Sequence, residues 1–229
     1  MKQDALPLPE QAPARGRADF LVSGCNEAAL RYLERWPNWP GRTLVLYGPE
    51  GCGKSHLVAL WRERSGAAVI AGDALGDRDP LVLAQGGACA VALDDAEHAS
   101  ERALLHLYNC CRESGASLLI VARATPAGSW PIALPDLASR LRAAPSVAIG
   151  LPDDALLAAV LVKQFADRQI LVAPNVVDFA VRRMERSFAA AAALADRLDR
   201  LALAAQGPIT LALARIALAD QSPSDFGVT

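Results

Sequence analysis

An eight-residue segment has the residue types and the spacing of a phosphate-binding loop. It fits the pattern G-x-x-x-x-G-K-[ST] and reads Gly48-Pro49-Glu50-Gly51-Cys52-Gly53-Lys54-Ser55. The glycines would let backbone N–H groups converge on phosphate oxygens, and the start of the following helix would add its positive end. Lys54 would reach the β- and γ-phosphates of a nucleotide, and the Ser55 hydroxyl would ligate Mg²⁺. We therefore predict that all eight residues bind nucleotide.

An acidic pair farther along the chain is the second half of such a site. Asp94 and Asp95 follow the apolar run Val91–Leu93 at the end of a predicted strand. Asp94 would bind the hydration shell of Mg²⁺, and Asp95 would orient the attacking water. Alone, the pair is explained equally well as a helix N-cap. After a phosphate loop we favour Ser55 and Asp94 as metal residues and Asp95 as a catalytic residue.

The elements that must position these residues alternate along the chain. Short apolar runs predict five strands, at Thr43–Tyr47, Ala67–Ala71, Cys89–Leu93, Leu118–Ala122 and Ser146–Ile149. Helical periodicity predicts helices over 26–36, 55–64, 101–113 and 137–142. Such alternation is typical of an α/β fold with a parallel sheet covered on both faces. The motif then joins a strand to a helix, as a phosphate-binding loop must. The alternative, a Gly-rich turn with an incidental lysine, does not require these flanking elements.

The pattern changes after Pro152. Four helical segments are predicted there, over 153–169, 174–185, 188–206 and 210–219. Asp153 suits the start of the first, and Pro174 suits the first turn of the second. We predict a flexible tail over residues 1–18, an α/β nucleotide-binding domain over 19–151 and a small all-helical domain over 152–229.

The composition excludes several classes of protein. Hydrophobic residues make up 52% of the 229 and charged residues 21%, as in a folded globular protein. The 23 basic residues face 25 acidic ones, which argues against a dedicated module for binding duplex DNA. No apolar run approaches the ~20 residues that cross a bilayer, and the N-terminus lacks the apolar stretch of a signal peptide. We expect a cytoplasmic protein without a membrane partner.

The five cysteines indicate neither a disulfide framework nor a zinc site. Their number is odd, and no C-x-x-C occurs. We predict that they are small buried core residues.

An α/β nucleotide domain followed by a helical lid is the layout of the AAA+ class, and several segments resemble its initiator-type family, DnaA and the shorter Hda. The phosphate loop and Asp94-Asp95 match the Walker A and Walker B elements of that family. Residues 19–22 with Asn26 resemble the segment that flanks the adenine, and residues 118–127 resemble the sensor 1 strand. The resemblance covers nearly the whole chain. It implies an AAA+ P-loop NTPase with a five-stranded parallel sheet and a helical lid, binding ADP or ATP with Mg²⁺.

The most specific resemblance lies in one segment, Leu134-Pro135-Asp136-Leu137-Ala138-Ser139-Arg140-Leu141. It is similar to the arginine-finger segment of Hda proteins, in which an arginine follows a serine. By that resemblance Arg140 is the finger, a catalytic residue that one subunit supplies to the nucleotide of another. Without the resemblance, Arg140 is best explained as a solvated arginine on a helix.

Three features favour the Hda branch over DnaA. The chain ends at Thr229, after the predicted lid, whereas DnaA continues into a basic DNA-binding domain. Residues 72–88 are a short link with the single basic residue Arg78, where DnaA has a long basic insertion. The N-terminal Gln3-Asp4-Ala5-Leu6-Pro7-Leu8 resembles the sliding-clamp-binding hexapeptide Q-L-x-L-P-L.

The hexapeptide would dock as an extended segment in an apolar groove of the clamp. Leu6 and Leu8 would anchor it, and Gln3 would make the polar contact. Asp4 departs from the usual leucine and would weaken binding. Without the rest of the chain, a Pro-rich tail explains the segment better.

Other departures from the family concern the nucleotide. Ala122-Arg123-Ala124 stand where the family has a polar sensor 1 residue. The sensor 2 arginine falls at Ala189, and Arg186, nearly one turn earlier, is the alternative. Loss of this contact to the γ-phosphate predicts a protein that holds ADP or binds nucleotide weakly, with a slow or absent ATPase of its own.

The resemblance implies a regulator of chromosomal replication initiation. Such a protein docks on the DNA-loaded sliding clamp, engages ATP-bound DnaA and promotes hydrolysis of that ATP with Arg140 in trans. It has no direct sequence-specific contact with DNA, and a homodimer is one state that the sequence leaves open.

Two other functions remain open. The first is an intrinsic AAA+ ATPase of the helicase-loader or clamp-loader kind, which robust turnover or affinity for single-stranded DNA would favour. The second is a small-molecule kinase, whose substrate set would be Arg182, Arg183, Arg186, Arg197 and Arg200.

Overall fold

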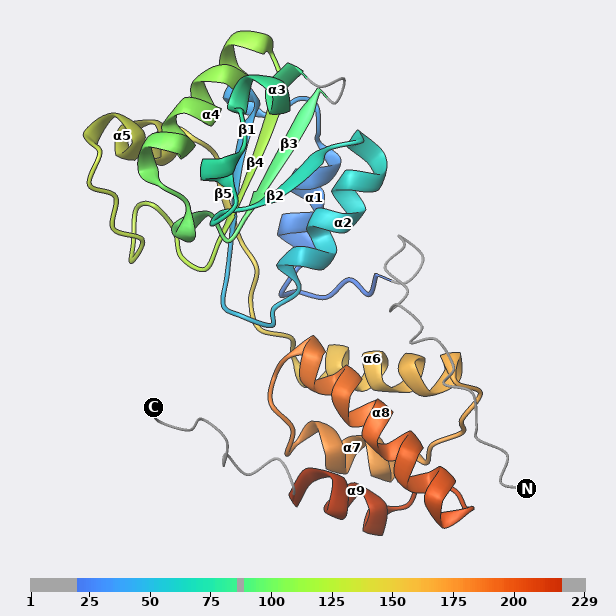
Figure 1. The fold of residues 1–229 in the computed structure, drawn as a ribbon. Coiled ribbons are helices and arrows are strands. Elements are labelled where there is room, and N and C mark those ends of the chain that lie inside the picture. Colours follow the sequence, from blue (N-terminus) through green and yellow to red (C-terminus); the bar gives the residue numbers. More distant parts are fainter. Residues whose placement is uncertain (1–19, 86–88, 220–229) are drawn as a thin grey trace.

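Five parallel strands form one sheet in the order β2-β3-β4-β1-β5, as Figure 1 shows. The computed structural model describes residues 20–85 and 89–219. The strands are β1 (Thr43–Tyr47), β2 (Ala68–Ala71), β3 (Ala90–Asp94), β4 (Ser117–Ala122) and β5 (Ser146–Ala148). β4 lies between β3 and β1, with Leu93 opposite Ile120 and Val45 opposite Ile120 on the other side. The ends of β1 and β3, where the phosphate loop and the acidic pair begin, therefore flank the end of β4.

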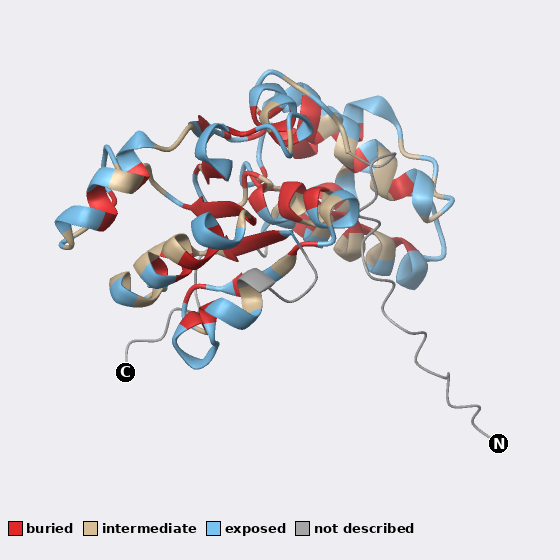
Figure 2. Cartoon of the chain, turned by 90° about the horizontal axis from the view of Figure 1, so that it is seen from above, coloured by how far each residue is buried: buried red, intermediate tan, exposed pale blue. Residues whose placement is uncertain are grey.

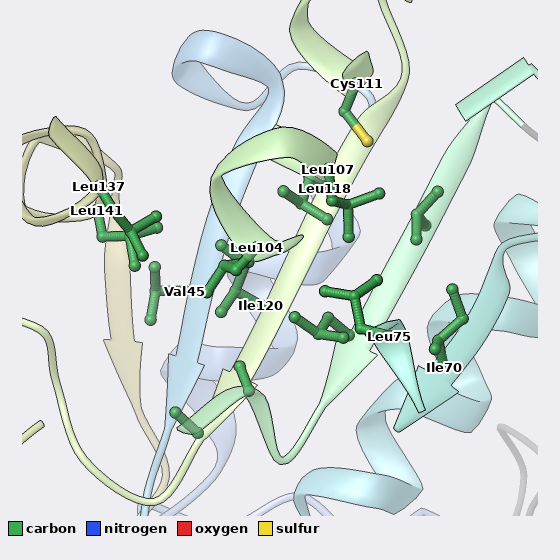
Figure 3. Close-up of a cluster of buried hydrophobic side chains, with 14 of the residues drawn as sticks. Val45, Ile70, Leu75, Leu104, Leu107, Cys111, Leu118, Ile120, Leu137 and Leu141 are labelled. Atoms are coloured by element: carbon green, nitrogen blue, oxygen red, sulfur yellow. The ribbon is translucent and has the colours of Figure 1, made fainter. Parts of the chain in front are cut away.

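Alternate residues of these strands enter two separate hydrophobic cores, as the period of two in a strand requires. Val45 and Ile120 belong to the first core, together with Leu104 and Leu107 of α4 (Glu101–Ser114) and Leu137 and Leu141 of α5 (Pro135–Ala143), as Figure 3 shows. The other face packs against α1 (Glu27–Glu34) and α2 (Lys54–Ser65). Helices thus cover both faces of the sheet, and the buried strands run through the centre of this part of the chain (Figure 2).

Up to residue 219, the last that the structure describes, four helices follow the last strand and share a third core. They are α6 (Asp154–Asp167), α7 (Pro174–Val181), α8 (Phe188–Ala205) and α9 (Leu211–Ala219). The predicted Asp153 cap is present, because its carboxylate accepts the N–H of Leu156 at 2.7 Å. Ser187 caps α8 in the same way, accepting the N–H of Ala190 at 3.0 Å. None of the described helices is long and apolar enough to cross a membrane.

The fold class predicted from the sequence is confirmed, with differences at the level of single elements. The short helix α3 (Pro80–Gln85) was not expected, because fewer than two turns give too little periodicity to detect. The second helix of the C-terminal part ends at Val181 rather than 185, and a turn continues the chain to the buried Met184.

The prediction of buried cysteines is confirmed for three of the five and wrong for one. Cys52, Cys110 and Cys111 are buried, and burial raises the pKa of the Cys111 thiol to about 12. Cys25 is half-buried and Cys89 is exposed. Cys89 directly precedes β3 and therefore lies outside the sheet's core.

Candidate functional site

Lys54 is the first residue of helix α2, and the phosphate loop buries its side chain. Its side chain is 8% exposed, and Nζ donates to the carbonyl oxygens of Gly48 at 2.7 Å and Pro49 at 2.8 Å. Gly53 before it has a φ of +99°, and Gly51 has a φ of +74°, both in the left-handed region. The loop therefore curls around the ammonium group, and the glycines make that curl possible without strain.

The structure brings Ser55 and Asp94 together, although 38 residues separate them in sequence. The Ser55 hydroxyl donates to Oδ2 of Asp94 at 3.2 Å, and Oδ1 accepts the N–H of Asp95 at 3.0 Å. Burial raises the pKa of the Asp94 carboxyl, and the hydrogen bonds from Asp95 and Ser55 oppose that rise only in part. A hydroxyl and a carboxylate side by side are hard oxygen ligands of the kind that Mg²⁺ prefers, so the donor set fits that ion.

Asp95 lies next to this pair in a constrained backbone. It has a φ of +48°, which aspartate tolerates better than most residues. A Cβ added at Gly72, directly after β2, would lie 2.2 Å from the Asp95 carbonyl oxygen. Only glycine therefore fits at position 72. The structure places Asp95 directly after Asp94, half-buried.

An arginine directly after β4 forms a salt bridge with the phosphate loop that was not predicted from the sequence. Nη1 of Arg123 lies 3.1 Å from Oε2 of Glu50, and its Nε lies 3.6 Å from Oε1 of Glu97. Glu97 also accepts the Arg123 backbone N–H at 3.1 Å. The contact joins the loop after β1 to the segment after β3. It could be predicted only if the order of the strands in the sheet were known.

The start of α8 rests on the phosphate loop. The backbone N–H of Phe188 donates to the Gly51 carbonyl at 3.3 Å. A Cβ at Gly51 would lie 2.5 Å from Cβ of Ser187, and one at Gly53 would lie 2.9 Å from the Phe188 ring. The loop glycines thus serve the approach of the helix as well as the curl of the loop.

The predicted sensor 2 position lies in this same turn. Ala189 is exposed there. The alternative, Arg186, donates from Nη2 to Oδ1 of Asp154 at 2.7 Å and from Nη1 to the Pro152 carbonyl at 3.4 Å. Its guanidinium is therefore bound to the start of α6.

The segment predicted to flank the adenine lies against the first turn of α2. The ring of Phe20 meets that of His56 edge to face, with centroids 5.2 Å apart. Asn26 is buried and donates to the Leu21 carbonyl at 3.0 Å, while its Oδ1 accepts the Ser23 N–H at 2.9 Å. These bonds fix the shape of the segment, and the contact of Phe20 with His56 joins it to the helix that follows the phosphate loop.

Arg140 is on α5, and the structure does not bring it to the phosphate loop. Its guanidinium binds Asp136 on the same helix and lies over Tyr108 of α4. α5 packs on the face of the sheet opposite α2, whose first turn carries Lys54 and Ser55. The remaining predicted residues, Gln3, Leu6 and Leu8, lie outside the described part of the chain.

Two of the arginines proposed for a kinase contact other parts of the helical region. Arg183 lies over the Phe179 ring, with Cζ 4.0 Å from the centroid. Arg197 donates to the Ala217 carbonyl at 3.0 Å, within the helical part. Nothing in this arrangement favours a substrate-binding set.

Solved structures with a similar fold include initiators and a motor. Domain III of the replication initiation protein DnaA from Thermotoga maritima aligns over 91% of this chain and 97% of its own, with a TM-score of 0.77 at 17% identity. The replication initiator DnaA bound to AMPPCP and single-stranded DNA aligns over 85% and 69%, with a TM-score of 0.67 at 16% identity. The Thermotoga maritima RuvB Holliday junction branch migration motor aligns over 81% and 64%, with a TM-score of 0.67 at 13% identity.

These likenesses establish an AAA+ fold of the DnaA domain III kind. No family model matches the sequence, and no curated protein matches it either.

Proposed function

We propose that this chain is an Hda-like regulator of replication initiation that stimulates hydrolysis of ATP bound to DnaA. It supplies Arg140 across an interface with DnaA and docks on the DNA-loaded sliding clamp through Gln3, Leu6 and Leu8. Structural likeness to DnaA domain III supports a pairing in which an AAA+ subunit of this chain stacks on one of DnaA. Arginine fingers supplied in trans raise rates of phosphoryl transfer by ~10³–10⁵ where they are well placed.

The observation that carries the proposal is the position of Arg140. Its helix packs on the opposite face of the sheet from α2, as Figure 1 shows. Lys54 and Ser55 begin α2, and Asp94 lies beside Ser55. An arginine that cannot serve the loop of its own chain can serve the nucleotide of a neighbour. The guanidinium is the group that phosphoryl transfer needs there, because it binds the charge that builds on the γ-phosphate oxygens.

In the chain's own site, we propose that the loop from Gly48 to Ser55 holds ADP or ATP. A bound nucleotide with Mg²⁺ would stabilise the arrangement in which α8 rests on the loop. Lys54 would turn from the carbonyls of Gly48 and Pro49 to phosphate oxygens, and Ser55 and Asp94 would hold the metal. The DnaA structure bound to AMPPCP supports nucleotide binding by this fold.

An intrinsic AAA+ ATPase is the second candidate, and a specific observation favours it. Ser55, Asp94 and Asp95 lie together, which supports a role for them in holding Mg²⁺ and orienting water in this chain's own site. Against rapid turnover, no arginine stands at position 189, and Arg186 is bound to Asp154. Turnover by the isolated chain that exceeds its effect on DnaA would favour this candidate.

Reconstitution tests the proposal directly. DnaA loaded with ATP would be incubated with clamp on DNA, with and without this chain, and the DnaA-bound ADP would be measured. The proposal expects hydrolysis to accelerate only when chain and clamp are both present. A chain with Gln3→Ala and Leu6→Ala should lose the effect of the clamp while melting like wild type. Unchanged hydrolysis in the complete mixture would contradict the proposal.

A further inference from the structure

The guanidinium of Arg140 is held along one edge and on one face by groups from two helices. Nε donates to Oδ1 of Asp136 at 2.9 Å, and Nη2 donates to Oδ2 at 3.0 Å. These bonds pair one edge of the guanidinium with both carboxylate oxygens. The face lies over the Tyr108 ring of α4, with Cζ 5.5 Å from the centroid. Two neighbours therefore restrict the orientation of the side chain.

The other edge of the same group remains available. A guanidinium has five N–H donors, and Asp136 takes one from Nε and one from Nη2. Within residues 20–85 and 89–219, the donors of Nη1 and the second donor of Nη2 have no partner. They form an edge with two nearly parallel N–H bonds, which is the geometry in which arginine binds a phosphate.

The helix that carries Arg140 is anchored at its start. Glu101, the first residue of α4, accepts the backbone N–H of Ala133 at 2.8 Å and that of Leu134 at 2.6 Å. Leu137 and Leu141 are buried in the first core (Figure 3). Arg140 therefore projects from a helix fixed at one end by hydrogen bonds and along one side by packing.

We propose that Asp136 is a positioning residue for Arg140, which holds the Nε edge so that the Nη1–Nη2 edge faces the γ-phosphate in the partner. Tyr108 supports the face of the same group. This inference rests on the proposed function, in which Arg140 acts in trans. A long side chain loses rotamer freedom when it is ordered at an interface, and one that is already ordered loses less. Because the guanidinium binds charge that builds on the γ-phosphate oxygens in the transition state, ordering by Asp136 acts on the rate of the chemical step.

The test compares variants of the full chain in the hydrolysis of DnaA-bound ATP with clamp on DNA. Asp136→Asn keeps the size of the side chain but removes its charge and its second acceptor. We expect its rate at saturating protein to be about three- to tenfold lower, because the exposed pair orders Arg140 only in part. The concentration that gives half of the maximal effect should not change. Tyr108→Phe, which keeps the ring, should match wild type, and Tyr108→Leu should lower the rate.

A spectroscopic readout separates positioning from a structural role. The Nε–H proton of Arg140 should exchange slowly with water in wild type and faster in Asp136→Asn, as followed by NMR of arginine side chains. Arg142 is the matched control, because its Nε donates to the Ala138 carbonyl at 3.1 Å and should be unaffected. Equal exchange for Arg140 in both proteins would overturn the inference.

Parallel measurement of Arg140→Ala distinguishes the two claims. If Arg140→Ala abolishes stimulation while Asp136→Asn matches wild type, the positioning role is wrong and the trans finger stands. If Arg140→Ala stimulates fully, the trans finger is wrong, and the positioning role falls with it. Faster hydrolysis with Asp136→Asn would also overturn the inference, because it would mean that the carboxylate competes with the γ-phosphate for Arg140.

Discussion

Lys54 makes two hydrogen bonds to carbonyls of its own loop, and these bonds would be exchanged for bonds to phosphate. We predict that Lys54→Ala removes nucleotide binding. A ligand at a hundred times its dissociation constant stabilises a protein by ~2.7 kcal/mol, so added ADP or ATP should raise the melting temperature of wild type and not that of the variant.

Lys163→Ala is the matched control for this loss of a lysine. Lys163 pairs with Asp167 on α6, outside the phosphate loop, so its variant should respond to nucleotide as wild type does. A wild-type chain whose melting temperature does not change with either nucleotide would contradict the assignment of the loop.

Asp94, the proposed metal residue, lowers the stability of the fold when it is ionised. Because burial raises the pKa of its carboxyl, the folded chain holds this proton more tightly than the unfolded chain does. The contribution of the group to stability is therefore lost as the pH rises from the ordinary carboxyl pKa through the raised one, and at pH 7 the ionised carboxylate destabilises the fold.

We predict that Asp94→Asn melts at a higher temperature than wild type at pH 7, without nucleotide or metal. The difference should shrink as the pH falls below about 4, where the unfolded carboxyl is also protonated. The same variant should bind nucleotide less tightly when Mg²⁺ is present. Asp73→Asn removes one exposed charge and serves as the control. A lower melting temperature for Asp94→Asn would contradict the dominance of burial.

The proximity of Lys54, Ser55 and Asp94 could be predicted from the sequence, because each lies in or after a recognisable local pattern. Lys54 and Ser55 belong to a motif that contains its own spacing, and Asp94 ends an apolar strand that is readily detected. The salt bridge of Arg123 with Glu50 could not be predicted, since it depends on β4 lying between β1 and β3. No periodicity within the sequence reports that order.

At the scale of the elements, the contact of α8 with the phosphate loop decides which glycines can be replaced. We predict that Gly51→Ala destabilises the chain by about 1–3 kcal/mol, because the position combines a left-handed φ with close approach. The added Cβ would lie 2.5 Å from Cβ of Ser187. Unfolding in urea would measure the change.

Gly76→Ala is the control for the Gly51 variant. Position 76 has no atom within 4 Å of an added Cβ and no left-handed φ, so the change should stay within about 0.5 kcal/mol. Equal stability of the two variants would mean that α8 does not rest on the loop in solution. Lower nucleotide affinity of Gly51→Ala is expected for the same reason.

The strands and long helices were predicted closely, and their ends less so. β1 matches its prediction at both ends, because Gly41-Arg42 before it and Gly48-Pro49 after it interrupt the apolar run. α5 begins at Pro135, two residues earlier than its apolar period suggests, since Glu101 accepts the N–H groups that precede it. A carboxylate 34 residues away in sequence is a tertiary signal that local patterns do not contain.

At the scale of the whole molecule, the proposed function depends on two surfaces that serve different nucleotides. The phosphate loop under α8 would bind the chain's own nucleotide, whereas α5 would present Arg140 to DnaA. The fold was predicted from the alternation of strands and helices, and the likeness to DnaA domain III confirms it. The proposed role of Arg140 rests on the resemblance of its segment and on the packing of α5 against the sheet face opposite α2.

The most direct measurement is the rate of hydrolysis of DnaA-bound ATP, with clamp on DNA, for Arg140→Ala, Arg140→Lys and Arg142→Ala. We predict that both Arg140 variants fold, bind clamp and bind nucleotide but lose stimulation by about 10³-fold or more, down to the rate without this chain. Lysine should not rescue the function, because a point charge lacks the fork of the guanidinium. Arg142→Ala, on the same helix, should stimulate like wild type. Full stimulation by Arg140→Ala would contradict the account.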